Sequence, residues 1–388
     1  MAQTYNSAGV YRQEVFLTAP PVLQTGVPAF VGFAGAPPGG TITFNTPVVL
    51  HRKEEFSLQF SSAAGSFLAD VVAGFFDNGG TRCYVVPADM TGNMVQGLLG
   101  GIHSLDSYDD LDLVAVPDAM LLRAFDGSPD RQSIARVQAE ALAHCAQLGN
   151  RLAILDSLPG AAIEDVMNQC QQLAAGQLQP VNGALYYPWI LTASNPSPLP
   201  PCGHVAGIYA RSDAQRGVFK APANEEIIGV LDLETQIDNS IQDELNPARV
   251  NCLRAFPGRG IRVWGARTIG TVPADLNWLY VNVRRLFLTL RRWIDLNMAW
   301  TTFETNDARL WVRVQRELAA FLTKLQSDGA LQGTTPDQAF YVKCDAENNP
   351  PELRDVGQVV IEIGLAPLSP AEFIVVRIVR QAGATSDD

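Results

Sequence analysis

The sequence has no long apolar run and no recognisable secretory leader. Among its 388 residues, no uninterrupted apolar stretch reaches the roughly 18 residues that a membrane-spanning helix requires. The N-terminal residues, MAQTYNSAGVYRQEV, contain no basic segment followed by an apolar one, which is the pattern of a secretory signal. We therefore expect no membrane insertion by this chain, and we expect its synthesis and assembly in the cytoplasm.

Cysteine and histidine are scarce, and neither is clustered along the chain. None of the six cysteines belongs to a C-x-x-C pair, so we predict buried, reduced thiols. The four histidines are isolated in sequence and form no H-E-x-x-H motif. The sequence therefore predicts no metal site. These residues are Cys83, Cys145, Cys170, Cys202, Cys252 and Cys344, with His51, His103, His144 and His204.

The motifs of nucleotide-binding and hydrolytic enzymes are also absent. The sequence contains neither G-x-x-x-x-G-K-[ST] nor G-x-S-x-G. Gly258, Gly260 and Gly265 fall in a predicted hairpin rather than between a strand and a helix, so we interpret them as turn glycines. The acidic cluster at 109–112 precedes a predicted strand and is expected to be a solvated loop, with a cation site as the alternative. We predict no enzyme, no catalytic residue and no cofactor.

Charged residues are few as well, at 18% of the chain against 47% hydrophobic residues. This balance is typical of a globular protein, and the length is sufficient for two domains. Up to about residue 245, short apolar runs alternate with segments of helical periodicity, which predicts an α/β layered fold. The expected strands are 26–35, 81–87, 111–117, 151–156 and 184–191, and the expected helices are 131–149 and 160–175.

The pattern changes after residue 246. Two β-prone runs flank Pro257-Gly258 and predict a hairpin. Farther along, we expect a strand leading into a helix, then a second helix whose N-terminus is capped by Asn306. Two β-prone runs follow near the C-terminus. The expected elements are strands at 250–256, 260–268, 280–284, 358–364 and 372–380, and helices at 285–300 and 307–326.

The net charge of −12 is unevenly spread along the chain. Residues 249–324 carry thirteen basic and five acidic side chains, a net of +8, which leaves −20 for the remainder. This asymmetry suggests two surfaces with different partners. A nucleic-acid-binding module is one alternative for the basic segment, although the whole chain is acidic and carries no recognition motif.

The predicted helix at 307–326 is apolar on one face and basic on the other. Solvent-facing side chains on a packed helix would explain the basic face. Its uniform sign on an acidic protein nevertheless favours contact with an acidic partner. We also predict that Trp311, on the apolar face, and Trp264, in an alternating strand, are core anchors. The basic face consists of Arg309, Arg313, Arg316 and Lys324.

Blocks along nearly the whole chain resemble the contractile tail sheath proteins of myophages, R-type pyocins and extracellular contractile injection systems. Each block is weakly specific alone, but their number, order and spacing make the resemblance specific. The clearest blocks are GVYRQEV (9–15), FFDNGGTRCYVV (75–86), GHVAGIYARSDAQRGVFKAPAN (203–224), LNPARVNCLRAFPGRGIRVWGART (245–268), FETNDARLWVRV (303–314) and GLAPLSPAEFIVVRI (364–378).

The resemblance implies a structural subunit that polymerises helically around an inner tube and contracts to drive the tube through a target envelope. It implies an α/β fold (α+β overall) with an outer α/β layered domain and an inner C-terminal α+β domain. Terminal strands would be exchanged between subunits, and both terminal runs are apolar enough for added strands. The expected division is 1–20 (linking arm), 21–245 (outer domain), 246–369 (inner domain) and 370–388 (linking arm). The expected arm contacts are Val10, Tyr11, Val15, Phe373, Val375, Val376 and Ile378.

The implied partners are further copies of the chain, an inner tube protein, and baseplate and terminal cap proteins, without nucleic acid. The basic helix face would point into the lumen and contact an acidic tube. The particle would be a phage tail or a tail-like particle, released or membrane-anchored. The alternative hypotheses are an α/β nucleotide-binding enzyme and a nucleic-acid-binding module using residues 249–324.

Overall fold

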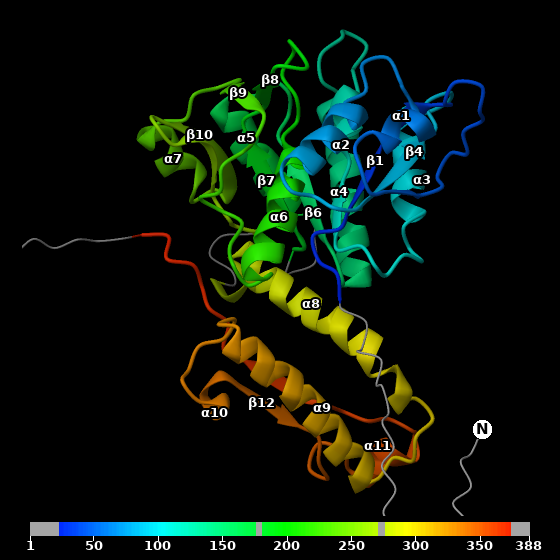
Figure 1. Ribbon diagram of the computed structural model, residues 1–388, viewed down its shortest axis with the longest axis vertical. Helices are drawn as coiled ribbons and strands as arrows, with labels where there is room; N and C mark the ends of the chain where they lie inside the picture. Colours follow the sequence, from blue (N-terminus) through cyan, green and yellow to red (C-terminus); the bar gives the residue numbers. More distant parts are fainter. Residues whose placement is uncertain (1–22, 176–180, 271–275, 374–388) are drawn as a thin grey trace, which may run out of the picture.

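The computed structural model describes residues 23–175, 181–270 and 276–373. Its largest part is a nine-stranded sheet between two layers of helices, and a long helix leads from it to a smaller C-terminal unit (Figure 1). The strand order is β11-β10-β7-β6-β5-β1-β4-β2, with β3 paired to β1 off this path. The strands are β1 (Pro28–Gly35), β2 (Val48–Leu50), β3 (Ser61–Ser62), β4 (Cys83–Ala88), β5 (Leu113–Ala115), β6 (Leu152–Asp156), β7 (Gly183–Tyr187), β10 (Val250–Phe256) and β11 (Gly260–Trp264).

The strands from β10 to β4 run parallel, whereas β2 and β11 pair antiparallel at the two edges. Parallel neighbours need crossover connections, which here contain helices. The inner strands are short and apolar, and β4, β6 and β7 are buried along their whole length. Continuous apolar strands are what a parallel sheet needs when both of its faces are covered.

Two hydrophobic cores fill the two sides of the sheet. One contains side chains of α3, α4, α5 and α7, and the other contains side chains of α1, α2, α6 and the first part of α8. A small antiparallel pair, β8 and β9, lies beside the sheet. The elements are α1 (Glu55–Gln59), α2 (Leu68–Asp77), α3 (Met94–His103), η1 (Pro117–Leu121), α4 (Arg131–Leu148), α5 (Ile163–Ala175), β8 (Ile190–Thr192), α6 (Cys202–Arg216), β9 (Val230–Leu233), α7 (Asn239–Leu245), η2 (Leu276–Trp278) and α8 (Val281–Asn297).

The C-terminal unit packs one long helix on a two-stranded sheet. Leu310, Trp311, Val314 and Leu318 of α9 form its core with partly buried residues of the strands. Trp293 of α8 stacks on Phe321 of α9, with ring centroids 4.1 Å apart, and joins this unit to α8. The elements are η3 (Ala299–Thr301), α9 (Ala308–Ser327), α10 (Pro336–Ala339), β12 (Phe340–Lys343), α11 (Pro351–Asp355) and β13 (Glu362–Leu365).

Most of the expected elements of the first 245 residues are present, and the six cysteines are buried, free thiols as predicted. Helix α4 ends where the sequence indicates, because Gly149 adopts φ 63°, a left-handed conformation that favours glycine. The run 184–191 is two strands rather than one, because Pro188 separates β7 from β8. Within the described residues, no helix is sufficiently long and apolar to cross a bilayer.

The predicted hairpin at 250–268 is present as β10 and β11, and β10 pairs with β7, so that it extends the large sheet past residue 246. Two expectations for the second half were wrong. Residues 281–284 are the first turn of α8 and not a strand, since burial of one helical face outweighs the β-prone valines. Helix α9 is capped by Asp307, whose carboxylate accepts from the backbone N–H groups of Arg309 and Leu310.

Candidate functional site

The crevice where α/β folds commonly bind phosphate groups is filled by the chain's own carboxylate. The strand order reverses between β1 and β5, and ligands of such folds bind beyond the carboxyl ends of the strands at this point. Here Asp118, fully buried in η1, accepts from the N–H of Phe33 (2.6 Å) and from the N–H of Phe67 (2.7 Å) at the start of α2. Its carboxylate also accepts from the hydroxyl of Ser66 at 2.7 Å.

Gly32 leaves the space for this carboxylate, because a Cβ at that position would lie 2.7 Å from the Asp118 Oδ2 atom. Burial raises the pKa of Asp118 to about 6, and its hydrogen bonds act in the opposite direction. An internal carboxylate therefore takes the N–H groups that a nucleotide phosphate would need. This arrangement does not favour the nucleotide-binding alternative.

The acidic cluster at 109–112 is exposed at Asp109 and Asp110, as expected of a solvated loop, but Asp112 is structural. Asp112 is buried and accepts from the backbone N–H groups of Gly26 and Val27. Asp110 pairs with Arg82 and accepts from the hydroxyl of Tyr84. Asp110 and Asp112 therefore have partners from this chain, whereas the side chain of Asp109 is exposed.

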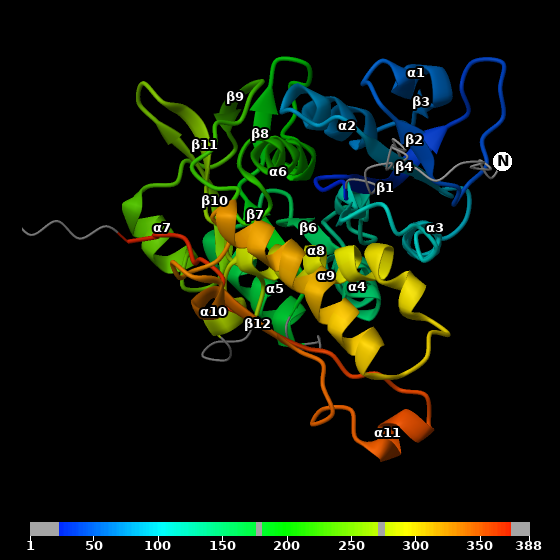
Figure 2. The same cartoon turned by 60° about the horizontal axis from the view of Figure 1, so that its bottom comes forward.

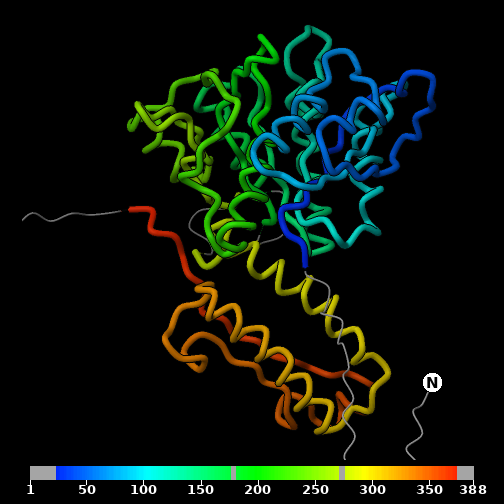
Figure 3. Tube along the Cα trace, viewed as in Figure 1, coloured from blue at the N-terminus to red at the C-terminus, as the bar shows by residue number. Residues whose placement is uncertain are grey.

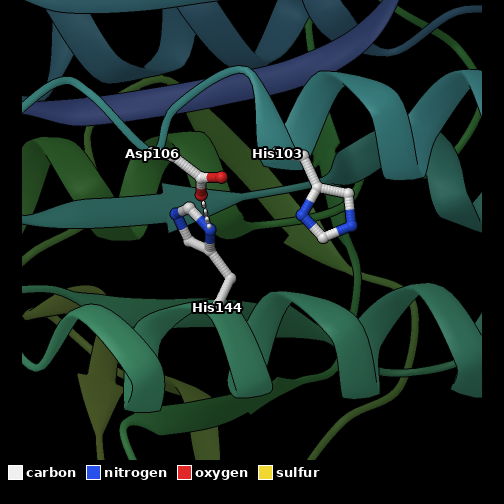
Figure 4. A group of neighbouring side chains, drawn as sticks. All are labelled: His103, Asp106 and His144. Atoms are coloured by element: carbon white, nitrogen blue, oxygen red, sulfur yellow. Dashed lines mark ion pairs between the residues drawn. The ribbon is translucent and has the colours of Figure 1, made fainter.

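Two of the histidines that are isolated in sequence, His103 and His144, lie together with Asp106 at the end of α3 and in α4. His103, Asp106 and His144 place one possible metal-ligand atom each within 4.8 Å of one another (Figure 4). His144 Nδ1 is 3.2 Å from Asp106 Oδ1, and its Nε2 is 3.2 Å from an Arg151 nitrogen. His103 and His144 are therefore isolated in sequence but not in space, because helix pairing brings α3 and α4 into contact.

The hydrogen bonds of His144 oppose metal binding at this cluster. Arg151 can only donate, so Nε2 accepts, and Nδ1 must keep its proton to donate to Asp106. Burial and, to a lesser extent, the nearby Arg151 charge lower the pKa of His144 to about 4, and Asp106 acts in the opposite direction. A neutral ring with both nitrogens engaged next to a buried guanidinium is a structural contact, and we assign no metal to it.

The predicted basic face lies on the exposed side of α9, which Figure 2 shows running alongside β12 in the C-terminal unit. All four of its cations are exposed. Arg313 pairs with Glu317 and stacks on Trp300, and Lys324 pairs with Asp328. Arg309 and Arg316 lie at the middle of the exposed side, and neither forms an ion pair within the part of the chain that the structure describes. The unneutralised charge of this face is therefore concentrated on these two arginines.

The net charge of +8 over 249–324 does not form one basic surface. Arg249, Arg285 and Arg292 are buried, and Arg285 pairs with Asp112 and Asp213. Arg267 pairs with Glu372 near the end of the described chain. Much of the excess therefore neutralises carboxylates that lie elsewhere in the sequence, which removes the basis for a nucleic-acid surface made by the whole segment.

The two tryptophans predicted as core anchors differ in their surroundings. Trp311 is 6% exposed, and its indole N–H donates to Asn306 at 2.9 Å. Trp264 is only half-buried, packs on Phe256 at 4.6 Å between ring centroids, and lines a surface hollow. The expectation of a core anchor is confirmed for Trp311 and wrong for Trp264, because β11 is an edge strand with one side open.

The expected arm contacts fall mainly beyond the described chain. Phe373 is the last described residue and its side chain is 74% exposed. β12 and β13 pair only with each other among the described strands, and Tyr341 of β12 is 53% exposed. The other expected contacts, which lie outside the described residues, are Val10, Tyr11, Val15, Val375, Val376 and Ile378.

Comparisons with known proteins cover nearly the whole chain. Residues 117–269 match the family model of the phage tail sheath protein central domain, and residues 274–381 match the phage tail sheath C-terminal domain. The tail sheath protein of Vibrio phage KVP40 is 28% identical over 237 residues, which are 60% of this chain. The chain spans 33% of the length of that relative.

Solved structures of contractile particles match over a larger share. A chain of the anti-feeding prophage (AFP) baseplate matches with a TM-score of 0.77 and 28% identity, covering 98% of this chain and 100% of that one. A chain of the PVC sheath complex of an extracellular contractile injection system, in its contracted state, matches with a TM-score of 0.74 and 26% identity, over 98% and 99% of the two chains. The similarity therefore includes both the large sheet and the C-terminal unit.

Proposed function

We propose that this chain, which belongs to the phage tail sheath family, is the structural subunit of a contractile sheath. In this function it polymerises helically with further copies of itself around an inner tube, and its contraction drives the tube through a target envelope. The observation that carries the proposal is the match, over 98% of its length, to a chain of the PVC sheath complex. The filled crevice at Asp118 is consistent with a mechanical rather than an enzymatic role.

We also assign the chain to a phage tail or tail-like particle, assembled in the cytoplasm and attached at one end to a baseplate. The match to a chain in the AFP baseplate supports the baseplate contact. A terminal cap is the further partner expected at the other end. Energy for contraction would come from the subunit contacts themselves: the extended lattice would be metastable and the contracted lattice would bury more surface.

Strand exchange is the proposed link between subunits. β12 and β13 form a two-stranded sheet packed on α9, and each strand keeps one edge that no other described strand covers. Its free edges would accept the β-prone terminal segments of neighbouring copies, with each backbone hydrogen bond contributing about 0.5–1.5 kcal/mol. Such links would keep the lattice connected while the subunits rotate. The domain limits at residues 20 and 370 stay part of this proposal.

Electron microscopy of the purified chain tests the assembly directly. We expect negatively stained samples to show helical tubes. Removal of residues 1–20, or of the residues after Pro370, should abolish the tubes while thermal unfolding still shows a folded monomer. Normal tubes from either truncated chain would contradict strand exchange, and an intact chain that never forms tubes would contradict the proposed function.

The basic face of α9 is proposed to face the lumen and contact an acidic tube. Individual exposed contacts contribute only about 0–1 kcal/mol, but helical repetition multiplies them along the tube. Weak individual contacts would also allow release during contraction. Because Arg309 and Arg316 have no ion pair within the described residues, we expect them to contribute more than Arg313 and Lys324.

Two matched double variants test this contact in reconstitution with the tube protein. Arg309→Glu with Arg316→Glu should allow the sheath to self-assemble but should abolish the extended form that surrounds the tube. Arg313→Glu with Lys324→Glu changes the charge by the same amount and should have a smaller effect. Extended particles of normal number from the first double variant would refute the lumenal contact.

A further inference from the structure

Both ends of the described chain are fastened to α8 or to the segment that enters it. At the N-terminal end, Arg292 of α8 donates to the carbonyl oxygen of Gln24 at 3.0 Å. Arg285 lies two turns earlier on the same face of α8 and donates to Asp112 at 2.8 Å, and Asp112 accepts from the N–H of Val27 at 2.7 Å. Arg285 and Arg292 are 2% and 4% exposed, so these contacts are shielded from solvent. Figure 3 shows the start of the described chain running down onto this helix.

At the C-terminal end, Glu372 is held by three different side chains. It accepts from Arg267 at 2.6 and 3.0 Å, from the Tyr280 hydroxyl at 3.1 Å and from the Asn246 amide at 3.0 Å. Tyr280 is the residue immediately before α8. In the first turn of α8, Asn282 donates to the carbonyl oxygen of Leu368 at 3.1 Å. The segment at 368–372 is thus tied to α8 and to the sheet, although it follows the C-terminal unit in sequence (Figure 1).

These two anchors lie at different points along one helix. α8 has 17 residues and is therefore about 25 Å long. The C-terminal anchor involves residues 280 and 282, whereas the N-terminal anchor involves residues 285 and 292. A continuous helix changes its length very little, so the separation of the two anchors is set by the position of these side chains along α8.

We propose that α8 is a strut that sets where both terminal segments leave the subunit, and that Glu372 is a positioning residue for their contacts with a second copy of the chain. This inference rests on the proposed function. A tether binds its neighbour with an effective concentration that depends on where the tether starts and how far it must reach. In a helical polymer the same geometry repeats at every subunit. A shift in the position at which a terminal segment leaves its subunit therefore recurs at every contact along the assembly.

A variant that removes the charge of Glu372 separates its proposed role in positioning the C-terminal segment from any role in folding. Glu372→Gln keeps the size of the side chain but removes the charge that pairs with Arg267. Asp165→Asn is the matched control, because Asp165 forms a similar two-bond pair with Arg131 at the distant α4–α5 surface. We expect both variants to unfold at nearly the wild-type temperature. The concentration at which helical tubes form should rise about tenfold or more for Glu372→Gln, a loss of roughly 1.4 kcal/mol per contact, and should not change for Asp165→Asn.

Arg267→Lys gives a second, independent variant, since lysine keeps the charge but not the paired geometry of the guanidinium. It should shift tube formation in the same direction as Glu372→Gln, and cryo-electron microscopy should show greater spread in helical rise and twist. Tubes with wild-type threshold and wild-type helical order from both variants would overturn the inference. So would a loss of assembly that simply follows a loss of monomer stability. Failure of the wild-type chain itself to form tubes would refute the proposed function instead.

Discussion

Replacement of Arg285 by methionine tests the buried ion cluster that attaches α8 to the large sheet. Arg285 donates to both oxygens of Asp213 at 2.8 and 2.6 Å and to Asp112 at 2.8 Å, and its guanidinium lies 4.9 Å from the centre of the Tyr209 ring. The three charged side chains are between 2% and 6% exposed. Methionine keeps most of the length of the side chain and leaves two carboxylates buried without a cation.

The expected cost follows from this burial. Removing one partner of a buried ion pair costs about 3–5 kcal/mol, because the remaining charge stays desolvated. A domain is stable by roughly 5–15 kcal/mol, so the variant should lose a large part of its stability. Arg131→Met, which removes a cation of similar pairing geometry from an exposed site, should cost far less because solvent screens that pair.

The loss of stability caused by Arg285→Met should depend on pH, and its direction follows from the carboxylate of Asp213. Burial already raises the pKa of Asp213 above 3.8, and Arg285 acts against this rise. Without Arg285 the native state should bind a proton at Asp213 at pH values where the unfolded chain does not. The cost of Arg285→Met should therefore be larger at pH 8 than at pH 5.

Urea unfolding of the wild type, Arg285→Met, Asp213→Asn and the double variant, each at pH 8 and pH 5, measures these effects. We expect Asp213→Asn to cost less in the methionine background than in the wild type, because it then removes an unpaired charge. A cost of Arg285→Met below about 1 kcal/mol at pH 8, or the same cost at both pH values, would refute the reasoning.

Two further predictions concern single buried side chains. Trp311→Ala should destabilise the protein by about 3–5 kcal/mol, whereas Trp264→Ala should cost clearly less because Trp264 is half-buried; equal losses in denaturant unfolding would contradict this difference. Burial raises the pKa of Asp156 from 3.8 to about 7, opposed by its hydrogen bonds with Cys202, so the native state holds a proton there that the unfolded chain releases between these pH values. Wild-type stability should consequently fall as pH rises through this window. The free energy of unfolding of Asp156→Asn, relative to that of the wild type, should rise by at most on the order of 4 kcal/mol from pH 4 to pH 8. A difference between the two proteins that calorimetry finds to be independent of pH would count against this assignment.

The sequence was sufficient to predict the layered α/β part and the amphipathic helix α9, because both depend on local periodicity. Short apolar runs between turn residues correspond to β4, β5 and β6, and the spacing of Leu310, Val314 and Leu318 marks the buried face of α9. The order of the signature blocks was likewise sufficient to indicate the family, which the two family models confirm.

The placement of charge could not be predicted in this way. A count over 249–324 treats Arg285 and Arg316 alike, yet one is buried between two carboxylates and the other is exposed. The strand prediction at 280–284 failed for a related reason, since α8 owes its helical start to tertiary burial of one face.

By itself, then, the sequence determined the types of the main elements, the two-faced character of α9 and the family. Only the tertiary structure decided that Asp118 fills the crevice of the sheet, that His103, Asp106 and His144 meet, and that Glu372 and Gln24 are both fastened near α8. The physical reason is that each of these contacts joins residues from separate elements. Their energies depend on burial and on distances that no local pattern of residues contains.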